Sequence, residues 1–141
     1  MATQMTEDEW QAFISEGTRT GKLSTIREDG GPHVVPVWFL LDGSDLVFTT
    51  EDRTVKSQNL LRDNRAALCV DDERPPFSYA VLRGRAEISE DPGQLLTWAT
   101  NIAARYMGQD LAEEFGRRNS VPGMFLVRLR IDHVTAWSAI A

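Results

Sequence analysis

Residues 21–50 decide the fold, and they read GKLSTIREDGGPHVVPVWFLLDGSDLVFTT. Three apolar segments are separated here by two turn signals, Asp29–Gly31 and Asp42–Gly43. Asp-Gly pairs between apolar segments are typical of β-hairpin turns. We therefore predict an antiparallel meander of three strands over residues 21–27, 33–41 and 46–50.

Apolar segments on either side of this stretch predict further strands and short helices. Strands are expected over residues 66–70, 79–88 and 125–131, with a bulge in the last one near Asp132. One helix follows the capping box formed by Thr6 and Glu9, and a longer helix follows Asp91. Shorter helices are expected over residues 53–62 and 111–117. Six antiparallel strands with short peripheral helices predict a mainly β fold, a small barrel, in one domain over residues 1–141.

The composition excludes several classes of protein. The chain has 15 Lys and Arg against 21 Asp and Glu, a net charge of −6, which argues against binding nucleic acid or an anionic membrane surface. Cys69 is the single cysteine, so neither an intrachain disulfide nor a Cys/His zinc site is expected. The acidic N-terminus is no signal peptide, and no apolar run reaches the ~18 residues of a membrane span. We expect a cytoplasmic protein.

The start of the helix over residues 53–62 is a candidate anion site. Free amides at a helix N-terminus bind anions, and Thr54 adds a hydroxyl there. Arg53 and Lys56 lie in the first turn, where the helix dipole disfavours each positive charge by about 0.3–1 kcal/mol. A bound phosphate would reverse the sign of that contribution. The alternative is a solvated loop in which Glu51 and Asp52 neutralise the cations.

Pro36 interrupts the second predicted strand, which is apolar on both sides and therefore expected to be covered on both faces. Proline cannot donate a ladder hydrogen bond, so it belongs at an edge or a bulge. The unpaired position could leave a wall for a planar ligand, although an ordinary bulge is the alternative. His33 and His133 are interpreted as structural. Since no side chain stands out as an acid, base or nucleophile, an enzyme of this sequence would rely on a cofactor.

Three stretches of the chain, residues 21–39, 48–66 and 82–88, resemble the pyridoxamine 5′-phosphate oxidase-like split barrels. The resemblance covers roughly residues 6 to 137. It implies a six-stranded split β-barrel that forms a homodimer, with two cofactor sites at the interface.

The resemblance also implies roles for individual residues. It places four residues at the cofactor phosphate and the strand end beside it: Lys56, Thr54, Thr50 and Thr49. Asn59 would support the loop. The tricyclic ring would be flanked by Val35, Pro36, Val37 and Trp38, which gives the proline a reason. Ser78 and Tyr79 would come from the partner chain and close the site.

The sequence departs from true pyridoxamine-phosphate oxidases in two places. Those enzymes carry an arginine near the start of the second strand, where this chain has His33 and Val34. They also end in an arginine-containing segment, which residues 134–141 lack. The chain looks more like the F420-dependent branch, typical of actinobacteria, which implies hydride transfer from reduced F420 to an unsaturated or conjugated small organic substrate. The alternatives are an FMN-dependent oxidoreductase and a non-catalytic flavin or haem binding protein.

Overall fold

Eight strands and four helices follow one another in the computed structural model, which describes all residues from 1 to 141. The strands are β1 (Thr3–Gln4), β2 (Gly21–Ile26), β3 (Pro32–Val37), β4 (Leu40–Asp42), β5 (Asp45–Glu51), β6 (Arg65–Asp72), β7 (Ser78–Ser89) and β8 (Met124–Ser138). The helices are α1 (Glu7–Ser15), α2 (Val55–Arg62), α3 (Pro92–Met107) and α4 (Gln109–Arg118). The mainly β antiparallel fold with short helices is confirmed.

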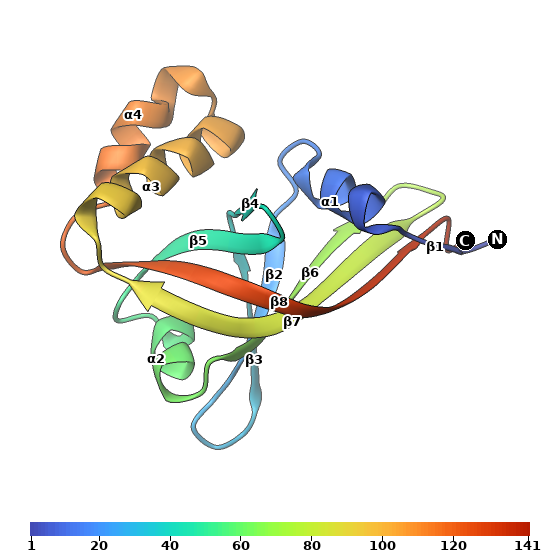
Figure 1. Ribbon diagram of the computed structural model, residues 1–141, viewed down its shortest axis with the longest axis horizontal. Coiled ribbons are helices and arrows are strands. Elements are labelled where there is room, and N and C mark those ends of the chain that lie inside the picture. The colour runs from blue at the N-terminus through green and yellow to red at the C-terminus, as the bar shows by residue number, and fades with distance from the viewer.

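The strands form one antiparallel sheet in the order β3-β2-β6-β7-β8-β5-β4, with the short β1 paired to the end of β8. The two edge strands, β3 and β4, are consecutive in the chain and only Trp38 and Phe39 separate them. The sheet therefore curves until its two edges meet at this linker (Figure 1). The result is a barrel that is split between β3 and β4.

The predicted count of six strands and the predicted meander were wrong in detail. The expected strand over residues 33–41 is broken, because Phe39 turns into the core and is fully buried. The chain thus makes two hairpins, β2–β3 and β4–β5, so only the end of the second predicted strand pairs with β5, which pairs with β8 on its other side. The two-residue β1, which pairs Thr3 with Ser138, accounts for the eighth strand.

Within a single chain, one face of the second predicted strand is not covered. β3 lies at the edge of the sheet, and alternate residues face outward, with Val34 63% exposed. Pro36 lies on this exposed side, opposite Lys22 of β2. An edge strand is where a proline is tolerated, because one of its sides has no neighbouring strand.

Several local predictions are confirmed. The Thr6 hydroxyl accepts a hydrogen bond from the Glu9 amide at 3.2 Å, and the Glu9 carboxylate accepts one from the Thr6 amide at 3.0 Å. The Asp91 carboxylate caps α3 by accepting from the Gln94 amide at 2.9 Å. β8 is bulged as expected, since the β7–β8 register shifts beside Asp132. None of the helices is long and apolar enough to span a membrane.

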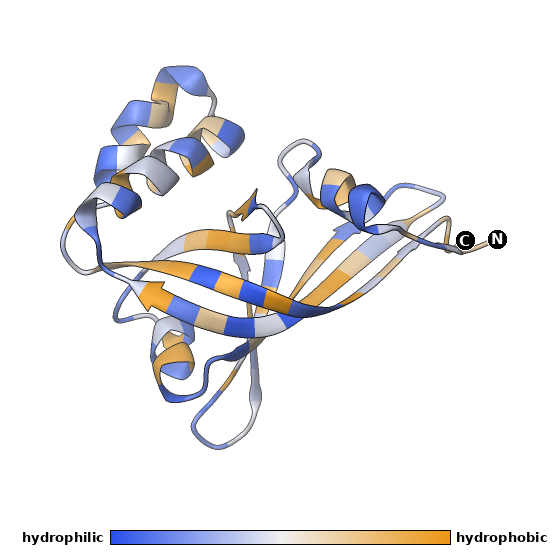
Figure 2. Ribbon diagram, in the orientation of Figure 1, coloured by the Kyte–Doolittle hydropathy of each residue, from blue (hydrophilic) through white to orange (hydrophobic).

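The main apolar core fills the barrel. Side chains alternate between inside and outside along β7 and β8, and Figure 2 shows the matching alternation of hydrophobic and hydrophilic positions. α3 and α4 form a hairpin to one side of the barrel (Figure 1), and α3 packs on β5 and β8. Buried Leu95 joins Val47 and Leu126 in a small second core below α3.

Candidate functional site

A cavity of about 350 Å³ lies where the split edge of the barrel meets α2 and the α3–α4 hairpin. Five residues assigned to the cofactor from the sequence line it: Pro36, Val37, Trp38, Thr49 and Lys56. The remaining lining residues are Thr20, Ala99, Ile102, Asn119 and Met124. The structure therefore brings the second predicted strand and the predicted helix start together, and we call this space the Lys56 cavity.

Lys56 is the cation of this cavity, and it has no partner of opposite charge. Its side chain is half-buried, and it takes part in none of the ion pairs of the molecule. Burial lowers the pKa of Lys56, and the charge of Glu51 opposes this shift without forming an ion pair. A half-buried ammonium without a counter-ion is unfavourable in the empty protein, and an anion in the cavity would stabilise it.

His33 lies near this lysine, and the sequence analysis missed its significance. Its Nδ1 atom is buried and has no hydrogen-bond partner. Burial is the main cause that lowers the pKa of His33, followed by the positive charges of Arg27 and Lys56. One signal could have identified it, because His33 stands where the related oxidases carry an arginine. The structure thus offers a second group that an anion could satisfy.

Hydrogen bonds among side-chain hydroxyl groups fix the conformation at the start of α2. Thr54 is the N-cap, and its Oγ1 accepts from the Ser57 amide at 3.3 Å and donates to the Glu51 carbonyl at 3.0 Å. The buried Thr50 hydroxyl lies 3.1 Å from that of Thr54. Both threonines thus shape the helix start, while Lys56 reaches the cavity. The contact of Thr54 and Thr50 with a cofactor stays a prediction.

Asn59 fixes α2 against the barrel. Its side chain is 4% exposed, and its Nδ2 donates to Thr25 Oγ1 of β2 at 3.0 Å. Its carbonyl oxygen accepts from Arg62 at 3.0 Å. These contacts hold α2 against β2, and a role of Asn59 in supporting a cofactor loop stays a prediction. Val35, in contrast, packs against the main core and does not line the cavity.

Ser78 and Tyr79 lie away from the Lys56 cavity within one chain. They begin β7, where Ser78 pairs with Asp72 and Tyr79 with Asp71 and Trp137. Ser78 lines a separate hollow beside α1. A single chain therefore does not bring these two residues to the predicted site, and their contribution from a partner chain stays a prediction.

A neighbouring cavity of about 540 Å³ is lined by two cations, Arg53 and Arg118, and by two carboxylates, Glu51 and Asp52. It shares Asn119 and Met124 with the Lys56 cavity. Arg118 contacts the ring of Phe115, and neither arginine forms an ion pair. The two cavities therefore make a continuous surface from Trp38 past Lys56 to the arginines.

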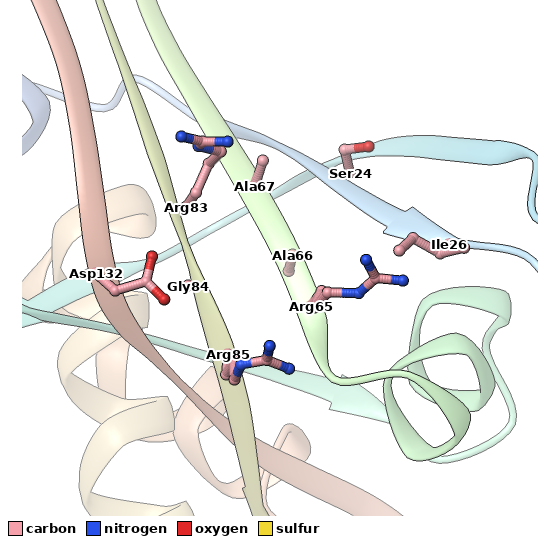
Figure 3. A pocket seen from close by; sticks show the side chains of 9 residues that line it. All are labelled: Ser24, Ile26, Arg65, Ala66, Ala67, Arg83, Gly84, Arg85 and Asp132. Atoms are coloured by element: carbon pink, nitrogen blue, oxygen red, sulfur yellow. The ribbon is translucent and has the colours of Figure 1, made fainter.

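A third cavity, of about 380 Å³, lies on the outer face of the sheet and contains three arginines (Figure 3). We call it the arginine cavity, and its arginines are Arg65, Arg83 and Arg85. Arg65 forms two hydrogen bonds to Asp63, of 3.0 and 2.7 Å, which lower the pKa of Asp63 to about 2. Arg85 donates to Asn64 at 3.2 Å. Arg83 forms neither an ion pair nor a side-chain hydrogen bond, and all three arginines are exposed, which is typical of a solvated surface.

Solved structures of several other proteins share this fold. A conserved hypothetical protein from Mycobacterium tuberculosis superposes with a TM-score of 0.84 at 26% identity, over 96% of this chain and 86% of that one. An F420 reductase superposes with a TM-score of 0.68 at 26% identity, over 91% of this chain and 95% of that one. A heme binding protein from Mycobacterium smegmatis superposes with a TM-score of 0.69 at 22% identity, over 97% of this chain and 55% of that one. This likeness shows the common fold alone.

The match extends to the sequence of almost the whole chain. Residues 6–138 fit the family model of pyridoxamine 5′-phosphate oxidase. That range includes the split edge of the barrel, α2 and the α3–α4 hairpin, which together form the Lys56 cavity. The chain belongs to the pyridoxamine 5′-phosphate oxidase-like split-barrel family.

Proposed function

We propose that this protein binds coenzyme F420 in the Lys56 cavity and transfers a hydride to an unsaturated or conjugated small organic substrate. The observation that carries the proposal is the half-buried Lys56, which lines a partly apolar cavity without a counter-ion. The unpartnered Nδ1 of His33 lies near it and fits the same anion. The residues present therefore suit a ligand with a phosphate and a planar ring.

The proposed contacts follow the lining of the cavity. Lys56 would bind the phosphate, with Thr49 at the strand end. His33 is not among the lining residues, so its contact with the anion is part of the proposal. Pro36 and Trp38 would flank the ring. When bound, the cofactor supplies the hydride, which is chemistry that no side chain of the chain provides.

The protein would contribute orientation and an environment with little water. Val37, Ala99 and Ile102 are buried apolar residues at the cavity wall, and Met124 closes it on the side of β8. Excluding water strengthens the attraction between Lys56 and an anion, because the local dielectric falls. A phosphate held at one end would fix where the ring lies along β3.

Two observations favour F420 over FMN. Arg53 and Arg118 add two cations beyond Lys56, and both lack ion-pair partners although Glu51 and Asp52 line the same cavity. F420 carries further carboxylates beyond its phosphate, whereas the phosphate of FMN is terminal. The F420 reductase among the similar structures, at 26% identity over 91% of this chain, supports the same choice.

A second copy of this chain would complete the site. Cross-strand pairing places Pro36, Lys22, Cys69, Val81 and Thr135 in one row on the outer face of the sheet. The neighbouring Val34 is exposed, and the side chains in the middle of this face are small. Tyr79 lies on the same face, and Pro36 belongs both to the row and to the Lys56 cavity. A partner packed symmetrically on this face would reach the cavity edge.

Parallel titration of the purified protein with F420 and with FMN tests the cofactor. We expect tighter binding of F420, and a loss of that preference in the double variant Arg53→Ala with Arg118→Ala. The control is Arg117→Ala on the same helix, since Arg117 is already paired with Glu113. Tighter binding of FMN would contradict the F420 proposal and favour an FMN-dependent oxidoreductase. A tight complex whose reduced F420 is never oxidised by enones or quinones would contradict catalysis.

Sedimentation of an Ala67→Trp variant tests the second copy. Ala67 lies on the outer face of β6 and is half-buried by its neighbours. An indole there should dissociate the dimer, because its bulk would prevent close packing of the partner on this face. Asn101→Trp, on the exposed side of α3, is the size-matched control and should leave the dimer intact. A wild-type protein that sediments as a monomer would contradict the proposed partner.

A further inference from the structure

The linker between β3 and β4 lacks the support of a strand ladder, and α3 supplies it. Both flanking strands are sheet edges, so the backbone of Phe39 has no strand partner. Instead, the Phe39 amide donates to the Tyr106 hydroxyl at 3.3 Å, and the Phe39 carbonyl accepts from Arg105 Nη1 at 2.9 Å. Two side chains of α3 thus satisfy backbone groups that would otherwise be unpaired at a buried residue.

The same two side chains tie this linker to the N-terminal part of the chain. Arg105 donates from Nη2 to the Ile14 carbonyl at 2.8 Å and from Nε to the Gly17 carbonyl at 2.9 Å. Tyr106 donates from its hydroxyl to the Arg19 carbonyl at 2.8 Å. Arg105 therefore donates to three backbone carbonyls and to no carboxylate, an arrangement that suits the five N–H groups of the planar guanidinium.

Trp38 is fixed by the same contacts. Its ring stacks on Tyr106 with the centroids 5.1 Å apart and an angle of 3° between the planes. The Arg105 guanidinium lies 4.9 Å from the Tyr106 ring centroid and 4.8 Å from that of Phe39. Trp38 lines the Lys56 cavity, whereas Tyr106 is not among its lining residues. The indole thus forms a wall whose position depends on side chains outside the cavity.

We propose that Arg105 and Tyr106 are positioning residues that hold the Trp38 indole as the wall for the planar ring of the cofactor. They set the affinity for the ring, whereas Lys56 sets the affinity for the phosphate. This inference rests on the proposed function, because it assigns the Trp38 side of the cavity to the ring. A planar ring that stacks against Trp38 binds more tightly when the indole is already immobile, because less side-chain entropy is lost on binding.

Binding of ligands with and without phosphate separates the two contributions. The probes are F420, FMN, and their phosphate-free forms, the deazariboflavin and riboflavin. Tyr106→Leu should weaken the phosphate-bearing and phosphate-free probes alike, by roughly three- to tenfold, since the stacked pair is lost. Lys56→Ala should weaken only the phosphate-bearing probes. Unchanged affinity for the phosphate-free probes in a folded Tyr106→Leu protein would overturn the inference.

Tyr106→Phe and Tyr106→Trp keep the inference testable if Tyr106→Leu does not fold. Tyr106→Phe removes the hydroxyl contacts and retains the stacked ring, so it should weaken ring binding less than Tyr106→Leu. Tyr106→Trp should restore stacking. A purely structural role of Tyr106 predicts lower thermal stability in Tyr106→Phe with unchanged riboflavin and deazariboflavin binding, and that result would contradict the proposal.

Trp38 fluorescence gives a measurement that does not need a ligand. The emission of Trp38 is obtained as the difference between the spectra of wild type and Trp38→Phe. Acrylamide should quench this emission more strongly in Tyr106→Leu and in Arg105→Met, because the indole becomes more accessible. An unchanged quenching constant in both variants would overturn the proposal that Arg105 and Tyr106 hold the Trp38 indole. If quenching changes as expected but Lys56→Ala leaves the binding of every probe unchanged, the proposed function is contradicted instead.

Discussion

The Lys56 cavity and the arginine cavity are both lined by cations, but their charges are satisfied in opposite ways. Arg65 and Arg85 are exposed and bonded to Asp63 and Asn64, whereas Lys56 is half-buried and has no ion pair. The two spaces have similar volumes, about 350 and 380 Å³, so size does not distinguish them. What distinguishes them is an unsatisfied charge in partly apolar surroundings.

This difference indicates which region is organised for a ligand. Exposed, paired arginines contribute little to stability and need no further partner. An unpaired cation that burial disfavours is retained only if something in the working state stabilises it, which is typical of a binding site. We therefore expect the charges of the arginine cavity to matter little for binding, the backbone packing beside it to matter for folding, and the charge of Lys56 to matter for binding.

The largest expected effect is on stability, from Gly84→Ala beside the arginine cavity. A Cβ at this position would lie 1.9 Å from the Arg130 carbonyl oxygen, a backbone atom that cannot move away alone. We expect a loss of roughly 3 kcal/mol in the free energy of unfolding, measured by denaturant titration. Gly30→Ala, a turn position with open space around it, is the control and should cost about 1 kcal/mol. Equal losses in the two variants would show that the bulge tolerates a side chain.

Lys56→Ala should have the next largest effect, on cofactor affinity. We expect binding to weaken by roughly 10- to 100-fold, because a charge-assisted contact worth about 1.5–3 kcal/mol is lost. The free energy of unfolding of the empty protein should stay constant or rise, since an unpaired, half-buried cation is removed. Calorimetric titration measures the first change and denaturant unfolding the second.

Arg85→Ala is the matched control for Lys56→Ala, because it also removes one positive charge. Its side chain is exposed and already bonded, so cofactor affinity should change less than about twofold. If Arg85→Ala weakens binding as much as Lys56→Ala, the distinction between the two cavities is lost and total charge governs affinity.

The smallest expected effect is on the pH dependence of stability, through His33. Burial, Arg27 and Lys56 lower the pKa of His33 below 6.5, so the neutral imidazole is favoured in the folded state. The stability that depends on neutral His33 is present above pH 6.5 and is lost as pH falls from there through the folded pKa. Denaturant unfolding should show a shallower acid-side decline in His33→Phe than in wild type. Identical slopes below pH 6.5 would contradict the burial of this imidazole.

An added anion should oppose this loss. Phosphate bound beside Lys56 would favour protonated His33 and raise its pKa, so the acid-side decline of the wild type should become shallower in phosphate than in chloride at equal ionic strength. His33→Phe should show no such difference. If the stability of the wild type declines equally in phosphate and in chloride, His33 does not belong to the proposed anion site.

Most secondary structure could be predicted from local signals. The capping box at Thr6, the cap at Asp91 and the bulge near Asp132 each depend on residues close in sequence, and all three are present. The break at Trp38 and Phe39 could not be predicted, because it depends on which strands lie at the sheet edges. The candidate anion site at the start of α2 was predicted from the residue pattern and the ring contacts on β3 from the resemblance, and one cavity contains both Pro36 and Lys56.

The antiparallel β class, the turns and the family can be read from the amino-acid sequence, because hydrophobic alternation and Asp-Gly turns act over a few residues. Three properties emerge only once the chain is folded: Lys56 has no counter-ion, His33 Nδ1 is buried without a partner, and Arg105 reaches Phe39. These properties depend on the distance between segments far apart in the chain. Burial and pairing of charge arise from packing, and no local pattern of residues encodes them.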